Sequence, residues 1–196
     1  MSDRLDTSPI VNIRGERVAL GPLHLDLLPL LERWDNDFAT VELRSGEARP
    51  ISSAEITAIY EPLIRGERSD WIGFAVYALP GLEPIGITNI RDFTNVNRTA
   101  EFGISIGDPA YRGRGLGTEA TRLVLDFAFT ILGVHNVWLD TASYNTAAIR
   151  AYVKAGFVEI GRRREALRRG DRLDDLVLMD CLATSFQRPP GTLPLP

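Results

Sequence analysis

Three glycines within seven residues mark the part of this sequence that most restricts its fold. The segment Arg112-Gly113-Arg114-Gly115-Leu116-Gly117-Thr118 follows an alternating, strand-like stretch at Ala100 to Ile106 and leads directly into a helical pattern. In that pattern the apolar residues recur three or four positions apart and form one stripe: Leu116, Ala120, Leu123, Val124, Phe127 and Ile131. The segment therefore predicts a strand, a glycine loop and a helix that lies against a sheet.

The predicted loop is suited to bind one anion. Successive backbone N–H groups and the positive end of the helix can face the same ligand, and glycine lets phosphate oxygens approach the backbone. Two common nucleotide sites are excluded, because a dinucleotide fingerprint requires glycine in place of Thr118 and a Walker loop requires Gly-Lys before the hydroxyl residue. A flexible turn without a ligand is the simpler alternative, but it does not explain Arg112 and Arg114 beside the glycines.

The other hydrophobic patterns predict a single domain of strands and helices. The chain has 196 residues, of which 44% are hydrophobic, and this suffices for one core. We expect strands at residues 17–23, 71–79, 84–91, 100–106, 137–142, 158–166 and 174–182, and helices at 26–34, 52–65, 116–132 and 146–155. The domain is expected over residues 1–187, with a polar leader at 1–16 and a loose, proline-rich tail at 188–196.

Composition restricts the class of function. The net charge of −4 argues against nucleic acid as a partner, because phosphate neutralisation needs a basic surface, and it suits an amine substrate. No apolar run reaches the roughly 20 residues of a membrane span, and no signal-peptide segment opens the sequence, so we expect a cytoplasmic protein without membrane contact. The single cysteine, Cys181, excludes internal disulfides and is expected in a core strand. His24 and His135 lack a further ligand at suitable spacing, so no metal site is expected.

The loop and its surroundings resemble a known signature. Arg112-x-x-Gly115-x-Gly117 is similar to the acyl-CoA motif of the GCN5-related N-acetyltransferase (GNAT) family. Further similarity at Asn145, Ala148, Tyr152 and Gly156-Phe157 resembles the branch that acetylates ribosomal-protein N-termini (RimJ/RimL-type), and it extends from Gly86 to Leu182. The resemblance implies an α/β (α+β) fold, with one GNAT-like domain whose central mixed, mostly antiparallel sheet of about seven strands is flanked by helices.

The resemblance also implies which residues hold acetyl-CoA. The backbone amides of the loop would bind the pyrophosphate: Arg112, Gly113, Arg114, Gly115, Leu116, Gly117 and Thr118. The end of the preceding strand would pair with the pantetheine arm as another strand would: Ile104, Ser105 and Ile106. Asn145 and Ala148 begin the next helix on the cofactor side, and Asn145 either only caps this helix or also bonds the cofactor arm.

Two side chains are candidates for the chemistry. Tyr152 lies four residues after Ala148 on the same helical face, and its counterpart in similar enzymes points its hydroxyl at the thioester sulfur; packing against the sheet is its alternative role. Full proton transfer from a tyrosine to a thiolate is uphill by roughly 2 kcal/mol at reference pKa values, so we expect Tyr152 to act as a hydrogen-bond donor. Glu101 is the candidate base for the amine, acting through water, and its alternative is an exposed ion pair.

The sequence thus predicts direct acetyl transfer from acetyl-CoA to a primary amine. The acceptor would be a protein N-terminus, or alternatively a small amine, amino acid or antibiotic, and a non-catalytic acyl-CoA sensor is a third possibility. Asn89 and Ser105 are weaker candidates for the acceptor pocket, whereas Glu119, in the first turn of a helix, is expected to be structural. Similar proteins are commonly homodimers, and the resemblance implies a homodimer here.

Overall fold

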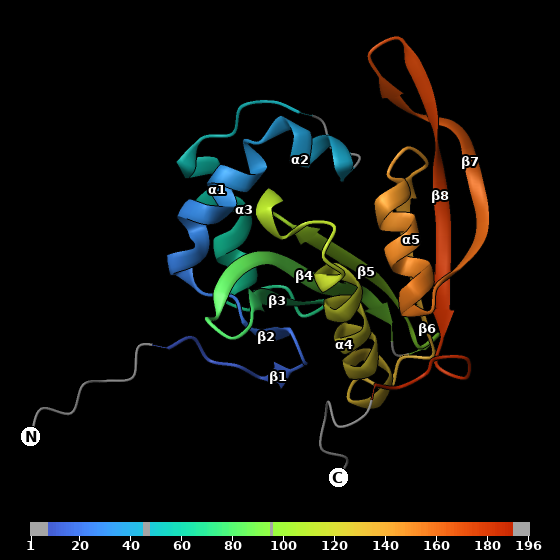
Figure 1. Ribbon diagram of the computed structural model, residues 1–196, viewed down its shortest axis with the longest axis horizontal. Coiled ribbons are helices and arrows are strands. Elements are labelled where there is room, and N and C mark those ends of the chain that lie inside the picture. The colour runs from blue at the N-terminus through green and yellow to red at the C-terminus, as the bar shows by residue number, and fades with distance from the viewer. Residues whose placement is uncertain (1–7, 45–47, 95, 190–196) are drawn as a thin grey trace, which may run out of the picture.

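The computed structural model describes residues 8–44, 48–94 and 96–189, in which helices cover both faces of one sheet (Figure 1). The strands are β1 (Ile13–Arg14), β2 (Val18–Pro22), β3 (Trp71–Ala78), β4 (Glu83–Thr94), β5 (Thr99–Ile106), β6 (Asn136–Ala142), β7 (Val158–Arg169) and β8 (Arg172–Leu182). The helices are α1 (Leu28–Asp35), α2 (Phe38–Leu43), α3 (Ser53–Ile64), α4 (Leu116–Thr130) and α5 (Thr146–Ala155), with 3-10 turns at Leu25–Leu27 and Pro109–Tyr111.

The sheet has the strand order β1-β2-β3-β4-β5-β6-β8-β7, and β5 and β6 are its parallel neighbours. These two strands pair only at Thr99 with Asn136, Ala100 with Val137 and Glu101 with Trp138 within the described chain. After these pairs both strands continue, but β5 and β6 no longer pair with each other. The last residues of β5 therefore have one edge, on the side of β6, that no strand of the sheet occupies.

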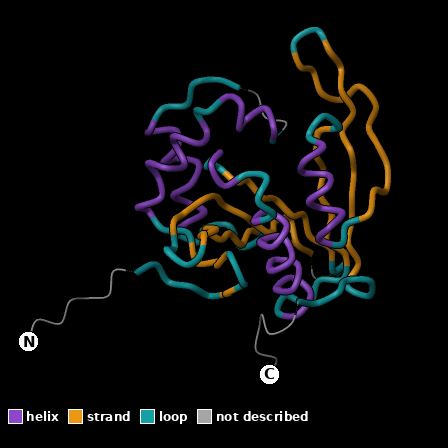
Figure 2. Tube along the Cα trace, in the orientation of Figure 1, coloured by secondary structure: helices purple, strands orange, loops and turns teal. Residues whose placement is uncertain are grey.

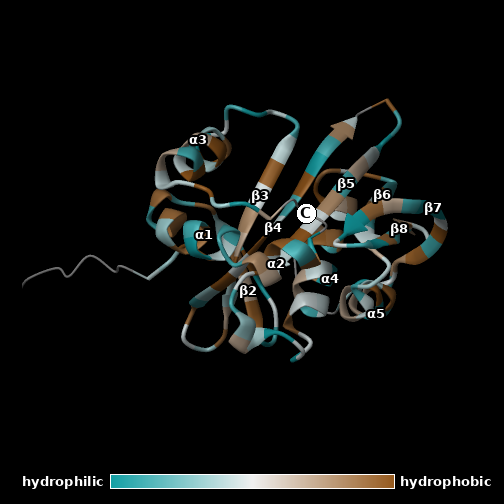
Figure 3. Cartoon of the chain, turned by 90° about the horizontal axis from the view of Figure 1, so that it is seen from above, coloured by the Kyte–Doolittle hydropathy of each residue, from teal (hydrophilic) through white to brown (hydrophobic). Residues whose placement is uncertain are grey.

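Each face of the sheet has its own hydrophobic core, since successive residues of a strand point to opposite faces. On β3, Phe74 and Val76 belong to the core under α4 and α5, whereas Ala75 and Tyr77 belong to the core under α1 and α3. Figure 2 shows the helices beside the strands, and Figure 3 shows that the helices carry both hydrophobic and hydrophilic residues. Helices with one buried side have this distribution.

The predicted fold class is confirmed, and the predicted strands and helices all form, with ends that shift by a few residues. The sheet has eight strands instead of about seven, because β1 joins β2 within what was predicted to be a leader, and Ile13 is buried there. The six-residue helix α2 was not predicted either. Both elements are too short for a hydrophobic period to reveal. Residues 1–7 of the leader and 190–196 of the tail lie outside the described residues.

Several smaller predictions can also be compared with the structure. Cys181 is buried in β8, as predicted for a core strand. The helix predicted at residues 52–65 forms as α3, and Ser52 caps it by accepting a hydrogen bond from the N–H of Glu55. In the described part of the chain no helix combines the length and the hydropathy that a membrane span needs.

Candidate active site

A cavity of about 640 Å³ opens where β5 and β6 separate. Its walls come from the end of β5, the loop before α4, the first turns of α5, and from α2, α3, β3 and β4. All the predicted cofactor residues except Arg114 and Leu116 line this cavity, together with Glu101. The Leu116 side chain is instead buried in the core, and the Arg114 guanidinium lies 5.5 Å from the centre of the Tyr111 ring.

The loop before α4 has the backbone shape of an anion site. Gly113 and Gly115 have φ angles of 72° and 80°, in the left-handed region where glycine is strongly preferred. Gly115 is the N-cap of α4 and supplies no side chain to its first turn. Within the described residues, the N–H groups from Gly113 to Thr118 donate no hydrogen bond. These amides and the positive end of α4 are thus free to bind one anion.

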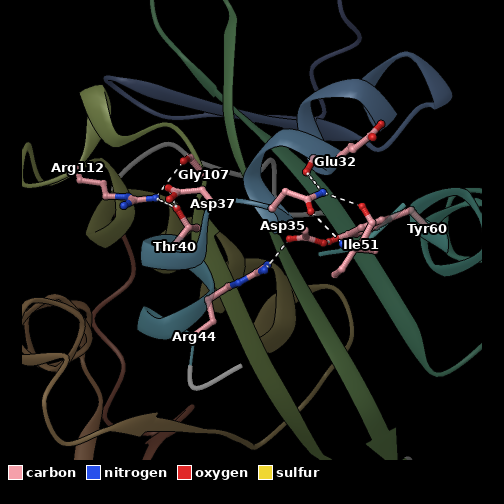
Figure 4. Close-up of polar contacts among 10 residues, drawn as sticks. Glu32, Asp35, Asp37, Thr40, Arg44, Ile51, Tyr60, Gly107 and Arg112 are labelled. Carbon is pink, nitrogen blue, oxygen red and sulfur yellow. Dashed lines mark hydrogen bonds and ion pairs between the residues drawn. The ribbon is translucent and has the colours of Figure 1, made fainter. Parts of the chain in front are cut away.

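The Arg112 side chain, by contrast, binds within the protein through two of its three guanidinium nitrogens (Figure 4). Its Nε donates to the carbonyl of Ile106 at 2.9 Å, and its Nη2 donates to the carbonyl of Gly107 at 3.0 Å and to Oγ1 of Thr40 at 2.6 Å. The guanidinium therefore fixes the end of β5 against α2. Arg112 also lines the cavity.

A second arginine, Arg17, stands at the loop and was not predicted from the sequence. Its Nη1 donates to the carbonyl of Arg114 at 3.0 Å, and its Nε donates to Oε2 of Glu119 at 3.0 Å. Glu119 also accepts from the backbone N–H of Arg17 at 2.8 Å, which fits the structural role expected for this carboxylate. No sequence pattern connects Arg17 with the loop, because β2 and α4 meet only in the fold.

Asn145 uses both atoms of its carboxamide within the protein. Its Oδ1 accepts from the N–H of Ala148 at 3.1 Å and caps α5, and its Nδ2 donates to the carbonyl of Leu43 at 2.8 Å. The neighbouring Tyr144 donates its hydroxyl to the carbonyl of Glu42 at 2.8 Å. Asn145 therefore caps α5 and also lines the cavity, and its contact with Leu43 holds α2 beside the start of α5.

Tyr152 lies in α5 with only 9% of its surface exposed. Its ring meets Phe102 edge-on at 6.3 Å between centres and packs against Phe157 at 5.9 Å. Burial, with a further contribution from the charge of Asp140, raises the pKa of Tyr152 to about 12. Its hydroxyl has no hydrogen-bond partner among the described residues, and Tyr152 lines the cavity. The side chain thus packs against the sheet and also keeps a free donor for a ligand.

Glu101 is buried, in contrast to the exposed strand position considered as its alternative. β5 lies in the middle of the sheet with neighbours on both sides at this residue, and this explains the burial. The carboxylate forms an ion pair with Nη2 of Arg91, its partner across β4. Glu101 therefore combines both predicted features: an ion pair and a position on the wall of the cavity.

The side of the cavity formed by α2, α3, β3 and β4 combines apolar and polar side chains. Its aliphatic and aromatic residues are Leu43, Ile59, Tyr60, Leu63, Trp71 and Ile87. Arg44 also lines it and donates to Oδ1 of Asp35 at 2.6 Å, while the Tyr60 hydroxyl donates to Oδ2 of the same carboxylate at 2.8 Å (Figure 4). Burial and this carboxylate raise the pKa of Tyr60. Arg44, Asp35 and Tyr60 thus brace α1, α2 and α3 against one another.

Residues 17–158 match the family model described as an acetyltransferase (GNAT) domain. The chain belongs to the GNAT family. This match spans β2 to the start of β7 and includes the loop, Glu101 and Tyr152. It also includes residues 17–85, which lie before the similarity noted from Gly86 to Leu182.

Individual GNAT proteins resemble this chain over shorter segments. A spermidine N(1)-acetyltransferase from Vibrio cholerae is 32% identical over 102 residues, which are 52% of this chain and 58% of that protein. A putative ribosomal N-acetyltransferase, YdaF from Bacillus subtilis, is 28% identical over 102 residues, which are 52% of this chain and 55% of that protein. The chain therefore spans little more than half the length of these curated relatives.

A solved GNAT structure resembles this chain over most of its length. The crystal structure of spermidine N-acetyltransferase from Vibrio cholerae, in complex with CoA and spermine, matches with a TM-score of 0.78 and 25% identity. The match covers 87% of this chain and 98% of that chain. The two proteins thus share one fold.

Proposed function

We propose that this GNAT protein transfers the acetyl group of acetyl-CoA to the primary amine of a small molecule. The observation that carries the proposal is the gap between β5 and β6, because one cavity there joins the anion loop, an open strand edge and the free hydroxyl of Tyr152. The spermidine N-acetyltransferases among the similar proteins support a small amine as the acceptor.

The loop and the strand edge suit the donor substrate in different ways. The free amides of residues 113–118 and the positive end of α4 favour a pyrophosphate, and the guanidinium of Arg17 adds a positive charge beside Gly115. The open edge of Ile104 to Ile106 can hydrogen-bond the amide groups of a pantetheine arm, as a neighbouring strand would. Glycine at positions 113 and 115 keeps side chains out of the space above the loop.

The side chains of the cavity account for the proton transfers of a direct reaction. Glu101 would accept the amine's proton through water before the nitrogen attacks the thioester, and the backbone N–H near Ile104 would stabilise the developing oxyanion. Tyr152 would donate a hydrogen bond to the sulfur. With a tyrosine pKa of about 12, full transfer of its proton to a thiolate is uphill by roughly 5 kcal/mol. Tyr152 therefore acts by donation, and no covalent enzyme intermediate is needed.

The raised pKa of Tyr152 gives a prediction about pH. A group whose pKa is raised to about 12 stays protonated at lower pH, so Tyr152 keeps its donor throughout the range from pH 7 to 10. As the pH rises over that range, the deprotonated fraction of the amine increases. We expect kcat/KM for the amine to rise from pH 7 to 10 and then level off. A decline within this range that the Tyr152→Phe variant lacks would contradict the assignment of Tyr152.

A protein N-terminus is the second candidate acceptor. The resemblance of the loop and of Asn145 to Phe157 to the RimJ/RimL-type branch supports it, as does the similarity to a putative ribosomal N-acetyltransferase. A peptide N-terminus presents a single α-amine of pKa near 8, which is easier to deprotonate than an alkyl amine. The two acceptors differ mainly in size, because a protein N-terminus brings a polypeptide chain to the cavity entrance and a small amine does not.

A thiol-release assay tests the proposed function. The protein is mixed with acetyl-CoA and, in separate reactions, with phenethylamine, spermidine, amino acids and short peptides with free N-termini. We expect free thiol to appear faster with a small amine than with any peptide. Faster release with a peptide would favour the N-terminal acceptor, and binding of acetyl-CoA without thiol release would identify a sensor.

We also propose that the protein forms a homodimer through β7. This strand lies at the edge of the sheet, and its Val158 and Ile160 are 63% and 59% exposed. Apolar side chains on an open strand edge are a common contact between subunits. Light scattering after size exclusion should give twice the mass of one chain, and Ile160→Lys should shift this mass to that of the monomer. A monomeric wild type would contradict the proposal.

A further inference from the structure

Asn89 carries a buried polar atom that nothing in the described chain satisfies. Its Oδ1 is buried without a hydrogen-bond partner, and the residue lines the cavity. A buried acceptor left unpaired destabilises the protein, so this atom is a favourable place for a ligand N–H group. The carboxamide is absent from the network around α1, α2 and α3, which uses Asp35, Tyr60 and Arg44.

Glycines flank this carboxamide on both neighbouring strands. Asn89 on β4 pairs with Gly73 of β3 on one side and with Gly103 of β5 on the other, and neither neighbour has a side chain. A Cβ at Gly103 would lie 3.1 Å from Nδ2 and 3.2 Å from Oδ1 of Asn89, closer than most such contacts. Substitution at Gly103 would therefore press against the amide. The ring of Trp71 lies over Gly73, and the Asn89 carboxamide with the Arg91 guanidinium lies over Gly103, so the two glycines make room for these three side chains at the cavity wall.

Asn89 also stands close to the proposed chemistry. Residues two apart on a strand share one face, so Asn89 and Arg91 on β4 lie beside Gly103 and Glu101 on β5. The candidate base and the unpaired oxygen thus border the same part of the cavity. An amine held by Oδ1 of Asn89 would lie within reach of a water that contacts Glu101.

The charges around Asn89 do not suit an acceptor with several positive charges. α2, α3, β3 and β4 contribute two arginines to the cavity wall, Arg44 and Arg91, and none of the lining residues on these elements is acidic. Both arginines are paired with carboxylates, Arg91 with Glu101 and Arg44 with Asp35, and Asp140 lies across the cavity on β6. The lining residues of α2, α3, β3 and β4 that the structure describes therefore include no unpaired carboxylate. Amines with pKa values near 10 are protonated at pH 7, so the additional charges of a polyamine would stay unpaired on this side of the cavity.

We propose that Oδ1 of Asn89 accepts a hydrogen bond from the acceptor amine, and that the acceptor is a monoamine with an apolar body. The apolar body would lie against the wall formed by Ile59, Leu63 and Trp71, where burial of apolar surface favours binding. This inference rests on the proposed small-amine function and narrows its substrate class. It separates this chain from the spermidine N-acetyltransferases that it resembles.

Steady-state kinetics with phenethylamine and spermidine test the inference. The wild type should show a kcat/KM for phenethylamine about tenfold or more above that for spermidine, as expected from one unpaired positive charge. Asn89→Leu keeps the size of the side chain and removes the acceptor, so KM for phenethylamine should rise about tenfold while KM for acetyl-CoA stays within about twofold. Asn89→Asp should move the preference toward spermidine.

The matched control is Asn97→Leu, the same substitution at an exposed turn outside the cavity, which should leave both KM values unchanged. An unchanged KM for phenethylamine in Asn89→Leu would overturn the role of Asn89. A wild type that prefers spermidine would overturn the acceptor class alone. If no amine releases thiol, the proposed function fails instead. In that case, calorimetry can measure the affinity of phenethylamine for the CoA-bound wild type and for CoA-bound Asn89→Leu. Equal affinities would contradict the role of Asn89.

Discussion

Replacing Tyr152 by phenylalanine should lower kcat by about 100-fold and leave KM for acetyl-CoA within about twofold of the wild type. The hydroxyl has no partner among the described residues, so its loss removes no hydrogen bond of the fold. The ring contacts with Phe102 and Phe157 are retained in the variant. Only the interaction with the sulfur, where charge develops during the reaction, is lost.

A matched control for this prediction is Tyr77→Phe. Tyr77 is also buried, but it belongs to the core under α1 and α3 and its hydroxyl contacts His24 outside the cavity. We expect Tyr77→Phe to change thermal stability and to leave kcat close to the wild-type value. Stopped-flow measurement of the chemical step separates a slower reaction from slower product release. An unchanged chemical step in Tyr152→Phe would remove Tyr152 from the mechanism.

Substituting valine for Gly115 should weaken acetyl-CoA binding by about 100-fold or more, because two effects act together. The φ angle of 80° at Gly115 is unfavourable for a β-branched residue. A Cβ there would also lie 3.3 Å from Nη2 of Arg17 and would enter the space where phosphate oxygens approach the loop amides. Calorimetric titration with acetyl-CoA measures the loss directly.

Gly133→Val separates these two effects. Gly133 follows the other end of α4, has a φ angle of 67°, and has nothing within 4 Å of a Cβ built on it. The same substitution therefore introduces similar backbone strain far from the loop. We expect Gly133→Val to lower stability without changing the affinity for acetyl-CoA. An equal loss of affinity in both variants would attribute the effect to strain and contradict the loop assignment.

The central part of the fold could be predicted because hydrophobic periodicity and glycine spacing can both be recognised within a short segment of sequence. The strand, glycine loop and helix around residues 112–118 form as predicted, and α5 has the predicted ends at Thr146 and Ala155. The helix α2 was missed, since six residues are too few for a clear period. Yet α2 carries Thr40, which binds Arg112, and Leu43, whose carbonyl binds Asn145.

The interactions of the side chains in the site were harder to predict than the position of the site. Glu101 and Tyr152 were expected near the cofactor, but the ion pair with Arg91 and the raised pKa of Tyr152 depend on neighbours from other strands. Arg17 reaches the loop only because β2 packs against α4. The surroundings of the unpaired Asn89 oxygen come from β3, β4 and β5 together, and no single segment contains that information.

Transfer of a labelled acetyl group tests the central claim most directly. The wild-type protein is incubated with acetyl-CoA deuterated in its acetyl group and with phenethylamine, and the mass of both the amine and the protein is measured. Direct transfer predicts that the label appears in the amine while the protein keeps its mass throughout turnover. Label that stays in acetyl-CoA, or that accumulates on the protein, would contradict the assignment of this cavity as the site of direct acetyl transfer.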